Sequence, residues 1–478
     1  MRWRRETRSR PWVAALAALL PGAGIAQAPD TAASIVAGAA AKLACSGLFI
    51  SHRTLTRVAD DDIGPLLAPL ADDVRYEVEG RTAVVATKEG LSRRAYYRPG
   101  LGCTLSLDDA PPPPQPNPAG APGAAPARML RRYDPDTTTR LEAAIAAIFA
   151  DAPDTRALVV LHHGALAAEH YAPGFTPETR LLGWSMAKSV TATLAGMLID
   201  DGALRLEAPA PVAAWSAPAD PRRAITLDQL LRMSSGLRFR EDYAPPDDAT
   251  AMLFARADMA GYAASQPLAA TPGSAWSYSS GTTDIVARIL TDRLGGPARF
   301  QAYARRRLFD PAGMRSVVFE QDAHGTPVGS SYLYASARDW ARFGQLYLHD
   351  GRAGGRQLIS RRWIDYVRSP APADPLGRYG GHFWLNGFAS ADRSMRVYPH
   401  LPSDTFLAKG HNGQYLVIIP SRDVVIVRLG WTTGRATFDV DARLAPILEA
   451  LRPVRVATRG GVAAADKEGR RHQSGEGQ

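Results

Sequence analysis

Lysine is scarce in this sequence of 478 residues, because only five of its 56 basic residues are lysine and the rest are arginine. An arginine side chain keeps its charge at every accessible pH, whereas a buried lysine amine can lose its proton and act as a base. Each lysine is therefore a candidate for chemistry that arginine cannot perform. The five positions are Lys42, Lys88, Lys188, Lys409 and Lys467.

Several catalytic and binding motifs are absent from the sequence. It contains no His-x-His-x-Asp and no His-Glu-x-x-His, so a zinc hydrolase has no support. It also lacks the Gly-x-Ser-x-Gly turn of α/β-hydrolases and a glycine-rich phosphate loop. The arginines are dispersed without interleaved aromatic residues. We therefore expect no metal, no cofactor and no nucleic-acid partner.

Apolar runs long enough to cross a bilayer are missing as well, since no segment after residue 28 reaches eighteen apolar residues. The short run from Trp12 to Leu20 follows five arginines and one glutamate, which carry +4 of the formal net charge of +9. It precedes Ala26-Gln27-Ala28, which has the small-x-small form of a signal-peptidase site. We predict that residues 1–28 are a cleaved export signal, and that the mature chain is periplasmic or secreted and has no membrane span.

Cysteine is nearly absent too, and Cys45 and Cys103 are the only possible disulfide partners. Because export leads to an oxidising compartment, we predict a disulfide between them. A bridge across that interval would stabilise the fold by roughly 4 kcal/mol through loop entropy. Two buried free thiols are the alternative.

Proline marks the division of the chain into regions. Four consecutive prolines, Pro111 to Pro114, open a segment rich in Pro, Gly and Ala that is unsuited to a helix or a central strand. We predict a linker over residues 109–130. It separates a small N-terminal region, residues 29–108, from a long domain over residues 131–456. The polar, glycine-rich residues 457–478 are predicted to be a disordered tail.

Apolar periodicity predicts strands at both ends of the long domain and helices between them. Short apolar runs on either side of His162-His163-Gly164 predict a β-hairpin, and residues 414–419 and 424–429 predict a second one. Strands that are distant in the sequence, with helices between them, indicate an α/β (α+β) fold whose antiparallel sheet is covered by helices. Helices are predicted over residues 138–149, 186–200, 226–233, 282–294, 298–308, 337–349, 361–367 and 442–451.

Lys188 is the only lysine with a serine three positions before it, in Ser185-Met186-Ala187-Lys188. Ser185 falls where the helix predicted over residues 186–200 begins, so its hydroxyl lies at the positive end of the helix dipole. Lys188 follows one turn later on the same face. A serine becomes a strong nucleophile when a neighbour takes its proton, and a lysine of lowered pKa can do so. The alternative is a capping serine followed by a surface lysine.

A serine–lysine pair usually works with a third group that passes the proton to the leaving group, and a tyrosine in a turn is one solution. Two such tyrosines precede predicted helices, in Tyr278-Ser279-Ser280 and in Tyr334-Ala335-Ser336. A nearby protonated Lys188 would lower the pKa of the tyrosine from about 10 and make it a usable base. Spacing alone leaves both tyrosines open.

Four segments between residues 131 and 452 together resemble the serine β-lactamase and penicillin-recognising superfamily, on the branch of class C β-lactamases, related esterases and 6-aminohexanoate-dimer hydrolases. The resemblance implies a β-lactamase/transpeptidase-like fold, with an antiparallel sheet flanked by helices and a mostly helical subdomain. The segments are Gly183-Trp184-Ser185-Met186-Ala187-Lys188-Ser189, Leu230-Leu231-Arg232-Met233-Ser234-Ser235-Gly236-Leu237, Trp276-Ser277-Tyr278-Ser279-Ser280-Gly281 and Gly410-His411-Asn412-Gly413-Gln414.

The resemblance also implies roles for single residues. Ser185 would be the acylated nucleophile, Lys188 its activating partner, and Tyr278, rather than Tyr334, the general base and acid. The main-chain N–H groups of Ser185 and Gln414 would form the oxyanion hole. Further contacts with the substrate are expected from Trp184, Tyr243, Ser280, His411, Asn412 and Gly413.

Three positions depart from the β-lactamase pattern. His411 and Asn412 stand where a lysine and a hydroxyl residue usually help to bind the substrate carboxylate, and Ser280 stands where class C enzymes have asparagine. We therefore expect an exported serine hydrolase that forms an acyl-enzyme and cleaves a small-molecule substrate, a short linear amide or ester. A β-lactamase or D-Ala-D-Ala carboxypeptidase, and a catalytically silent scaffold that binds cell-wall peptides, are the alternatives.

Overall fold

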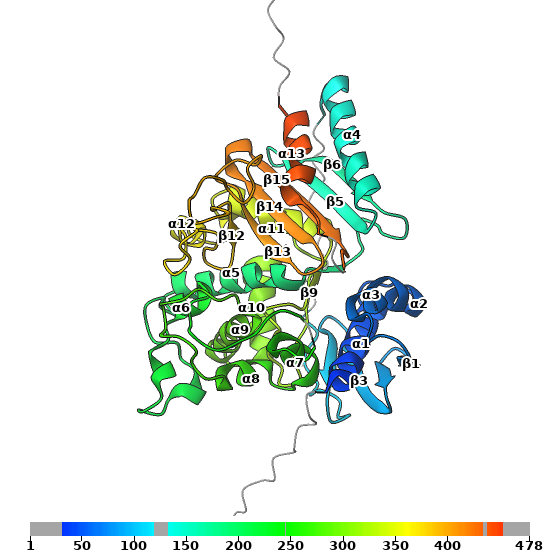
Figure 1. Ribbon diagram of the computed structural model, residues 1–478, viewed down its shortest axis with the longest axis vertical. Helices are drawn as coiled ribbons and strands as arrows, with labels where there is room; N and C mark the ends of the chain where they lie inside the picture. The colour runs from blue at the N-terminus through cyan, green and yellow to red at the C-terminus, as the bar shows by residue number, and fades with distance from the viewer. Residues whose placement is uncertain (1–30, 119–131, 244, 434–436, 453–478) are drawn as a thin grey trace, which may run out of the picture.

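The computed structural model describes residues 31–118, 132–243, 245–433 and 437–452. The predicted export signal and the predicted C-terminal tail lie outside the described residues. Figure 1 shows a large sheet in the upper part of the molecule, a layer of helices below it, and the N-terminal region beside those helices.

The large sheet has six antiparallel strands in the order β12-β13-β14-β15-β5-β6. Its central pairing joins the two ends of the domain, because Ile426 of β15 lies opposite Val160 of β5. Both predicted hairpins are present, and the predicted fold class is confirmed. The strands are β5 (Thr155–His162), β6 (Ala165–Tyr171), β12 (Trp384–Leu385), β13 (Phe406–Gly410), β14 (Gln414–Ile419) and β15 (Val424–Gly430).

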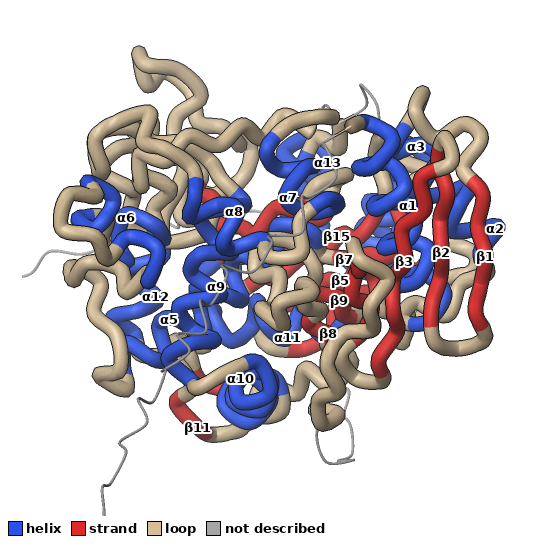
Figure 2. The backbone as a smooth tube through the Cα atoms, turned by 90° about the horizontal axis from the view of Figure 1, so that it is seen from below, coloured by secondary structure: helices blue, strands red, loops and turns tan. Residues whose placement is uncertain are grey.

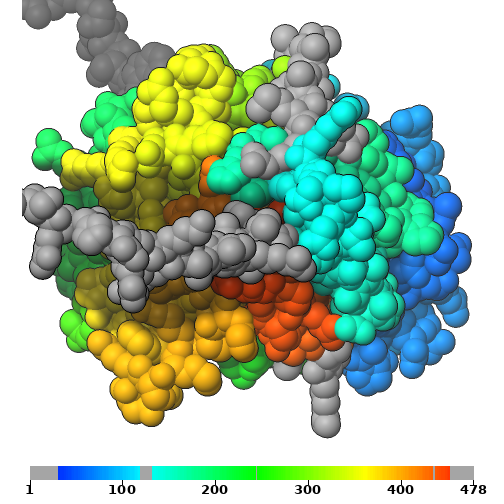
Figure 3. Space-filling view, turned by 90° about the horizontal axis from the view of Figure 1, so that it is seen from above, coloured from blue at the N-terminus to red at the C-terminus, as the bar shows by residue number. Residues whose placement is uncertain are grey.

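Alternate side chains of this sheet fill two cores, one on each face. Leu158 and Val160 pack with Ile145 of α4 and Ile447 of α13. The intervening Val159 belongs to the core on the other face, which α11 covers. Figure 3 shows α4 and α13 side by side over the first face. These helices are α4 (Pro135–Asp151), α11 (Ala337–Leu348) and α13 (Val440–Ala450).

The layer of helices surrounds α9, which contacts α5, α6, α8 and α10. Helix α10 ends at Ala304, earlier than predicted, and continues as a π-helical turn, Arg305–Phe309. The short helices α7 and α8 were not predicted. The bounds are α5 (Ala187–Asp200), α6 (Leu227–Leu231), α7 (Asp248–Ala255), α8 (Met259–Ser265), α9 (Ser280–Leu294), α10 (Pro297–Ala304) and α12 (Arg361–Arg368).

Two small sheets complete the hydrolase domain. A three-stranded sheet in the order β7-β9-β8 links the start of the Ser185 segment to the chain around residue 334. A two-stranded ribbon follows α11. The strands are β7 (Leu181–Leu182), β8 (Val318–Phe319), β9 (Leu333–Ala335), β10 (Arg352–Ala353) and β11 (Arg356–Gln357).

The N-terminal region consists of a long helix, α1, packed on a four-stranded antiparallel sheet. Figure 2 shows strands of this sheet side by side at one edge of the molecule. A disulfide joins Cys45 of α1 to Cys103 of β4, as predicted. The elements are α1 (Ala32–Phe49), α2 (Leu55–Val58), α3 (Gly64–Leu67), β1 (Arg75–Glu79), β2 (Ala83–Lys88), β3 (Leu91–Arg98) and β4 (Gly102–Ser106).

The N-terminal region shares its core with the hydrolase domain instead of standing apart from it. Helix α1 packs against α7, and a Cβ at Gly38 would lie 2.0 Å from the carbonyl oxygen of Phe254, so the close approach requires glycine. Lys42 forms an ion pair with Glu320, and both side chains are buried. The segment 109–118, at the start of the predicted linker, has no helix or strand.

Helix α1 is long and apolar enough, by length and composition, to cross a membrane, and it is the only such helix in the described residues. The sequence analysis overlooked it because Ser34, Lys42 and Ser46 interrupt its apolar residues. In the folded structure 83% of this segment is buried. It therefore serves as a core helix, and its apolar surface is covered by protein on all sides.

Candidate active site

Ser185 lies in a 3-10 turn, Trp184–Met186, that leads directly into α5. Trp184 has a φ of +47°, which places it in the left-handed region. A bulky residue adopts this conformation at a cost of about 1–3 kcal/mol, and such residues gather at active sites. Gly183 makes the turn possible, because a Cβ there would come within 2.4 Å of the Trp340 ring.

Lys188 donates hydrogen bonds to three oxygen atoms from a position that is only 1% exposed. Its Nζ lies 3.0 Å from Ser185 Oγ, 2.8 Å from Ser280 Oγ and 3.1 Å from the carbonyl oxygen of Ser330. The structure thus brings together the serine and lysine that the sequence placed one helical turn apart.

The electrostatic surroundings of Lys188 act on its pKa in opposite directions. Burial lowers the pKa, and the carboxyl groups of Glu241 and Asp284 raise it. Burial is the larger effect, so the pKa of Lys188 lies below its usual value. A lysine in this environment can hold or release a proton during a reaction, which an arginine cannot do.

Ser280 occupies a different place from the one expected. It was predicted to contact substrate, but its side chain is fully buried between Lys188 and Glu241. Its Oγ accepts a hydrogen bond from Lys188 and donates one of 2.7 Å to Glu241 Oε1. Ser280 differs from the prediction because it lies at the start of α9, where its hydroxyl points inward to Lys188 and Glu241. Ser280 therefore links the lysine to a carboxylate.

Tyr278 lies next to Lys188, with its ring centroid 4.8 Å from Nζ. It also packs against Trp384 and Tyr379, with ring centroids 5.4 Å and 6.0 Å away. Burial, and then the carboxyl group of Glu241, raise its pKa well above the usual value, while its contact with Ser185 lowers it. The expected lowering of the tyrosine pKa by Lys188 is therefore wrong, because desolvation of the phenolate outweighs any attraction to the lysine.

Tyr334, the second tyrosine candidate, lies elsewhere in the molecule. It is buried on β9, where Glu320 and Ser46 act on its pKa and Lys42 Nζ lies 6.0 Å from its ring. This is the contact region between α1 and the hydrolase domain. The structure therefore brings Tyr278 to the serine–lysine pair and leaves Tyr334 away from it.

The predicted third motif forms the turn between β13 and β14. Gly410 lies so close to Gly183 that a Cβ there would be 2.1 Å from the Gly183 carbonyl oxygen. The turn therefore lies against the Ser185 segment. The side chain of Gln414 holds the turn, donating to the carbonyl oxygens of Asn412 and Gly430 at 3.0 Å and 2.6 Å.

The strand register decides where the main chain of this turn points. Asn386 N–H donates to the carbonyl oxygen of Thr405 at 3.1 Å, which directs Thr405 towards β12. The N–H and C=O groups of successive residues point to opposite edges of a strand. Because those of Thr405 point towards β12, those of Gly410, five residues later, point towards its partner Gln414 on β14. The N–H of Gln414 therefore lies within the ladder, and His411 is the first residue beyond it.

His411, Tyr243 and Trp184 form a group of rings beside Ser185. The ring centroid of His411 is 4.3 Å from that of Tyr243 and 5.7 Å from that of Trp184. Burial lowers the pKa of His411 to about 4, so the imidazole is neutral near pH 7. Tyr243 donates to Glu241 Oε1 at 2.6 Å. Burial, and then the Glu241 carboxyl group, raise the pKa of Tyr243 well above its usual value, while its contact with Ser185 lowers it.

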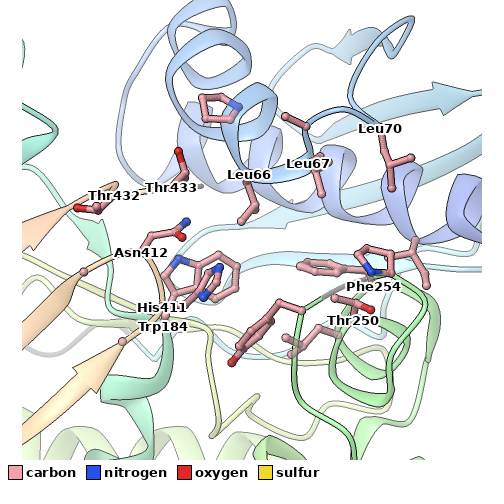
Figure 4. A pocket seen from close by; sticks show the side chains of 18 of the residues that line it. Leu66, Leu67, Leu70, Trp184, Thr250, Phe254, His411, Asn412, Thr432 and Thr433 are labelled. Atoms are coloured by element: carbon pink, nitrogen blue, oxygen red, sulfur yellow. The ribbon is translucent and has the colours of Figure 1, made fainter. Parts of the chain in front are cut away.

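A cavity of about 670 Å³ opens beside these rings. Trp184, Tyr243, His411, Asn412 and Gly413 line it, so five of the residues predicted to contact substrate share one pocket. Figure 4 shows the side chains of Trp184 and His411 near its centre and Asn412 at one side. The volume is in the range of pockets that bind small molecules.

Two acidic residues of the site were missed by the sequence analysis. Glu241 lies two residues before Tyr243 in a loop, where no periodicity marks a carboxylate that points into the site. Asp284 is fully buried one turn after Ser280, and its carboxylate accepts hydrogen bonds from Ser330 N–H and Oγ. An aspartate four residues after Ser280, within the helix predicted over residues 282–294, was the available signal.

Across the described parts of the chain, no group of three His, Cys, Asp or Glu side chains could hold a metal ion. The polar groups around Ser185 are instead hydroxyls, one lysine and two carboxyls, which hydrogen bonds connect. Such a set suits nucleophilic chemistry at a serine.

Comparison with known proteins agrees with this fold. Residues 145–450 match the family model described as Beta-lactamase. The chain is 26% identical over 338 residues to the 6-aminohexanoate-dimer hydrolase of Paenarthrobacter ureafaciens, an alignment that covers 64% of this chain and 82% of that protein.

Solved structures show the same architecture. A putative 6-aminohexanoate-dimer hydrolase from Bacillus anthracis superposes with a TM-score of 0.53 and 23% identity, covering 67% of this chain and 85% of that one. A family VIII carboxylesterase gives a TM-score of 0.50 and 17% identity, covering 67% and 98%. The fold is that of β-lactamases and transpeptidases, with an antiparallel sheet flanked by helices.

The fold and the family match define a β-lactamase-fold hydrolase. The chain belongs to the β-lactamase family, whose members are serine hydrolases. Residues 31–108 lie outside the range that the family model matches.

Proposed function

We propose that the chain is an exported serine hydrolase that forms an acyl-enzyme on Ser185 and cleaves linear esters or amides. The position of Lys188 carries the proposal, because its Nζ lies 3.0 Å from Ser185 Oγ in a site that lowers the lysine pKa. A neutral lysine at that distance can take the hydroxyl proton as the oxygen attacks a carbonyl carbon.

The oxyanion of the tetrahedral intermediate would accept hydrogen bonds from two main-chain N–H groups. The first belongs to Ser185, at the positive end of α5. For the second, the register of β13 and β14 favours His411 over the expected Gln414, whose N–H faces Gly410. Each such donor typically contributes a factor of about 10² to 10³ in rate.

Tyr278 would complete acylation by protonating the leaving atom. Its raised pKa keeps the phenol neutral, so it has a proton to give. As the phenol donates that proton, Lys188 passes on the proton it received from Ser185, and no net charge is left on the tyrosine. Water then attacks the acyl carbon and gives a proton to neutral Lys188. The bond between that carbon and Ser185 Oγ breaks, Lys188 returns the proton to Oγ, and the carboxylic acid is released.

His411 stands where β-lactamases usually have lysine, and its lowered pKa makes it neutral, so this position offers no positive charge to a substrate carboxylate. The relative named as a 6-aminohexanoate-dimer hydrolase supports a linear amide as the bond that is cleaved. A chromogenic cephalosporin and a nitrophenyl ester, assayed side by side, separate this proposal from a β-lactamase. We expect the ester to be cleaved much faster.

Export is part of the proposal. The arginine-rich start of the chain, the short apolar run after it and the Cys45–Cys103 disulfide support it. Sequencing the N-terminus of protein recovered from the periplasm or the medium tests it. We expect the mature chain to begin at Pro29, after Ala28.

Covalent labelling tests the nucleophile. A fluorophosphonate probe should add to Ser185, as detected by mass spectrometry of the peptide that contains it. Ser185→Ala should abolish labelling, whereas Ser265→Ala, an exposed serine on α8, should leave it intact. Labelling that survives Ser185→Ala contradicts the proposal, and complete absence of labelling supports a silent scaffold.

A lysine-specific variant tests the activating group. Lys188→Arg keeps a positive charge but cannot release its proton near neutral pH, so turnover should fall to background. Lys88→Arg, in the N-terminal sheet, is the matched control and should remain active. Substantial turnover by Lys188→Arg would refute the role of Lys188.

A further inference from the structure

We propose that the N-terminal region, residues 31–108, forms one wall of the substrate pocket beside Ser185, and that this pocket binds an uncharged, apolar acyl chain. The inference rests on the proposed function, because it names the substrate class of the same site. It also gives a role to the part of the chain that the family match leaves out.

The cavity lies between two parts of the molecule. The hydrolase domain contributes the rings of Trp184, Tyr243 and His411 and residues of α7. The N-terminal region contributes Ile35 of α1 and the six consecutive residues 65–70. Figure 4 shows Leu66, Leu67 and Leu70 on the segment that faces Trp184, His411 and Phe254. Without the N-terminal region, this side of the active site would be open to solvent.

The N-terminal wall is held in a fixed position. Lys42 of α1 pairs with Glu320 of the hydrolase domain, and the disulfide joins α1 to β4. Trp431, which follows β15, donates from Nε1 to the carbonyl oxygen of Asp62 at 2.9 Å, two residues before α3. The ion pair and the disulfide therefore fix α1, and the Trp431 hydrogen bond fixes the segment that leads into α3. The pocket is thus formed before substrate binds.

The chemistry of the lining fits an apolar, uncharged group. No Lys, Arg, Asp or Glu is found among the described residues that line the cavity. The wall at residues 65–70 reads Pro-Leu-Leu-Ala-Pro-Leu. An ionised group placed against residues 65–70 would lose its hydration and meet only apolar side chains there, which is costly, whereas each methylene buried against this wall is favourable.

The pocket lies on the acyl side of the scissile bond. In the proposed mechanism the leaving group is next to Tyr278, because that hydroxyl protonates it. Ser185 and Tyr278, with the Tyr278 neighbours Tyr379 and Trp384, are not among the described residues that line the cavity. Trp184, which precedes Ser185, His411, at the oxyanion turn, and Tyr243 do line it, so the cavity adjoins the serine on the side away from Tyr278. The chain attached to the carbonyl carbon is therefore the part of the substrate that enters it.

A series of p-nitrophenyl esters from acetyl to octanoyl tests the inference. In the wild type, kcat/KM should rise with chain length, by up to about fourfold for each methylene that is buried. Leu66→Trp fills part of the pocket from the N-terminal wall. It should lower the ratio of octanoyl to acetyl kcat/KM by about tenfold or more.

Two further variants keep the result interpretable. Leu66→Ala enlarges the pocket and should shift the best substrate to a longer chain. Val78→Trp is the matched control, since Val78 is 39% exposed on β1 of the same region, away from the cavity. An unchanged ratio in Leu66→Trp, or an equal fall in Val78→Trp, would overturn the inference. So would a Leu66→Trp effect confined to acetyl esters of longer alcohols, because it would place the leaving group in the pocket.

A binding measurement separates this inference from the proposed function. Ser185→Ala protein, titrated with octanamide in a calorimeter, should bind it, and Ser185→Ala/Leu66→Trp should bind about tenfold more weakly. Failure of labelling and turnover together with this difference would refute the hydrolase but not the wall of the pocket. Labelling and turnover without this difference would refute the wall alone.

Discussion

Lys42 on α1 and Glu320 of the hydrolase domain form an ion pair whose side chains are 1% and 0% exposed. The same carboxylate accepts the Ser46 hydroxyl at 2.9 Å and the Cys103 N–H at 2.6 Å. One acidic side chain of the hydrolase domain therefore binds both elements that the disulfide connects. This arrangement explains how an added region can be fixed firmly enough to line an active site.

Breaking this pair on one side should destabilise the whole protein. Lys42→Met leaves the Glu320 carboxylate buried without its cation, and the loss of one partner of a buried pair typically costs about 3–5 kcal/mol. Lys42→Met/Glu320→Gln removes both charges and keeps an amide oxygen that can accept from Ser46 Oγ and Cys103 N–H. It should recover most of the loss. Urea unfolding of the two variants and the wild type measures the difference, and equal midpoints for the single and double variants would contradict it.

Removing the carboxylate of Glu241 should shift the pH dependence of catalysis. Glu241 raises the pKa of Lys188, so Glu241→Gln lowers that pKa further. Because the reaction needs Lys188 to be neutral, the acid limb of kcat/KM should move to lower pH. A pH–rate profile with a nitrophenyl ester measures the shift.

The control for Glu241 is Glu207→Gln, a change at an exposed position before α6. Its profile should coincide with that of the wild type. An acid limb that stays in place, or moves to higher pH, in Glu241→Gln would show that Lys188 is not the group that must lose its proton.

Much of the fold follows from local patterns that the sequence carries. The hairpins of β5–β6 and β14–β15, the start of α5 at Ser185 and the helices α9 and α11 all agree with apolar periodicity and turn residues. Ser185 and Lys188 were identifiable because a helix brings residues three apart onto one face. Motif spacing also pointed to Tyr278, which the structure brings next to Lys188.

The rest depends on contacts that no local pattern encodes. The docking of α1 beside α7 requires Gly38 to meet Phe254, residues more than two hundred positions apart. The inward direction of Ser280 and the raised pKa of Tyr278 arise from burial around Glu241, a loop residue. Tertiary packing sets the desolvation of each group, so the direction of the tyrosine pKa shift could not be read from charge proximity alone.

Tyr278 should matter more for poor leaving groups than for good ones. Nitrophenolate leaves without a proton, whereas an alkylamine must be protonated as the C–N bond breaks. Tyr278→Phe should therefore lower kcat for an alkylamide by about 10² to 10⁴, and lower it far less for the nitrophenyl ester of the same acid. Parallel kinetics on the two substrates measure the contrast.

Tyr379→Phe is the matched change for Tyr278, because that ring packs against Tyr278. It should affect both substrates to a similar, small extent. An equal loss on ester and amide in Tyr278→Phe would argue that the tyrosine positions groups and does not act as the acid.

Burial also perturbs Asp284, whose pKa is raised to about 7. In an unfolded chain the value is about 3.9. Between these values the folded protein holds a proton that the unfolded chain has lost. The free energy of unfolding therefore decreases as pH rises from about 4 to about 7, by at most about 1.4 kcal/mol for each pH unit.

Asp284→Asn removes this titration and keeps an oxygen that can accept the Ser330 N–H. We expect the variant to gain stability relative to the wild type as pH rises from 5 to 8, because the wild type loses the contribution of its bound proton and the amide does not. Urea unfolding at several pH values measures the difference. Asp365→Asn, at an exposed position of α12, should run parallel to the wild type. The contrary outcome is a difference in unfolding free energy between Asp284→Asn and the wild type that stays constant over this pH range. It would mean that Asp284 is already ionised at pH 5. The surrounding hydroxyls and Lys188 would then stabilise its charge more than burial opposes it.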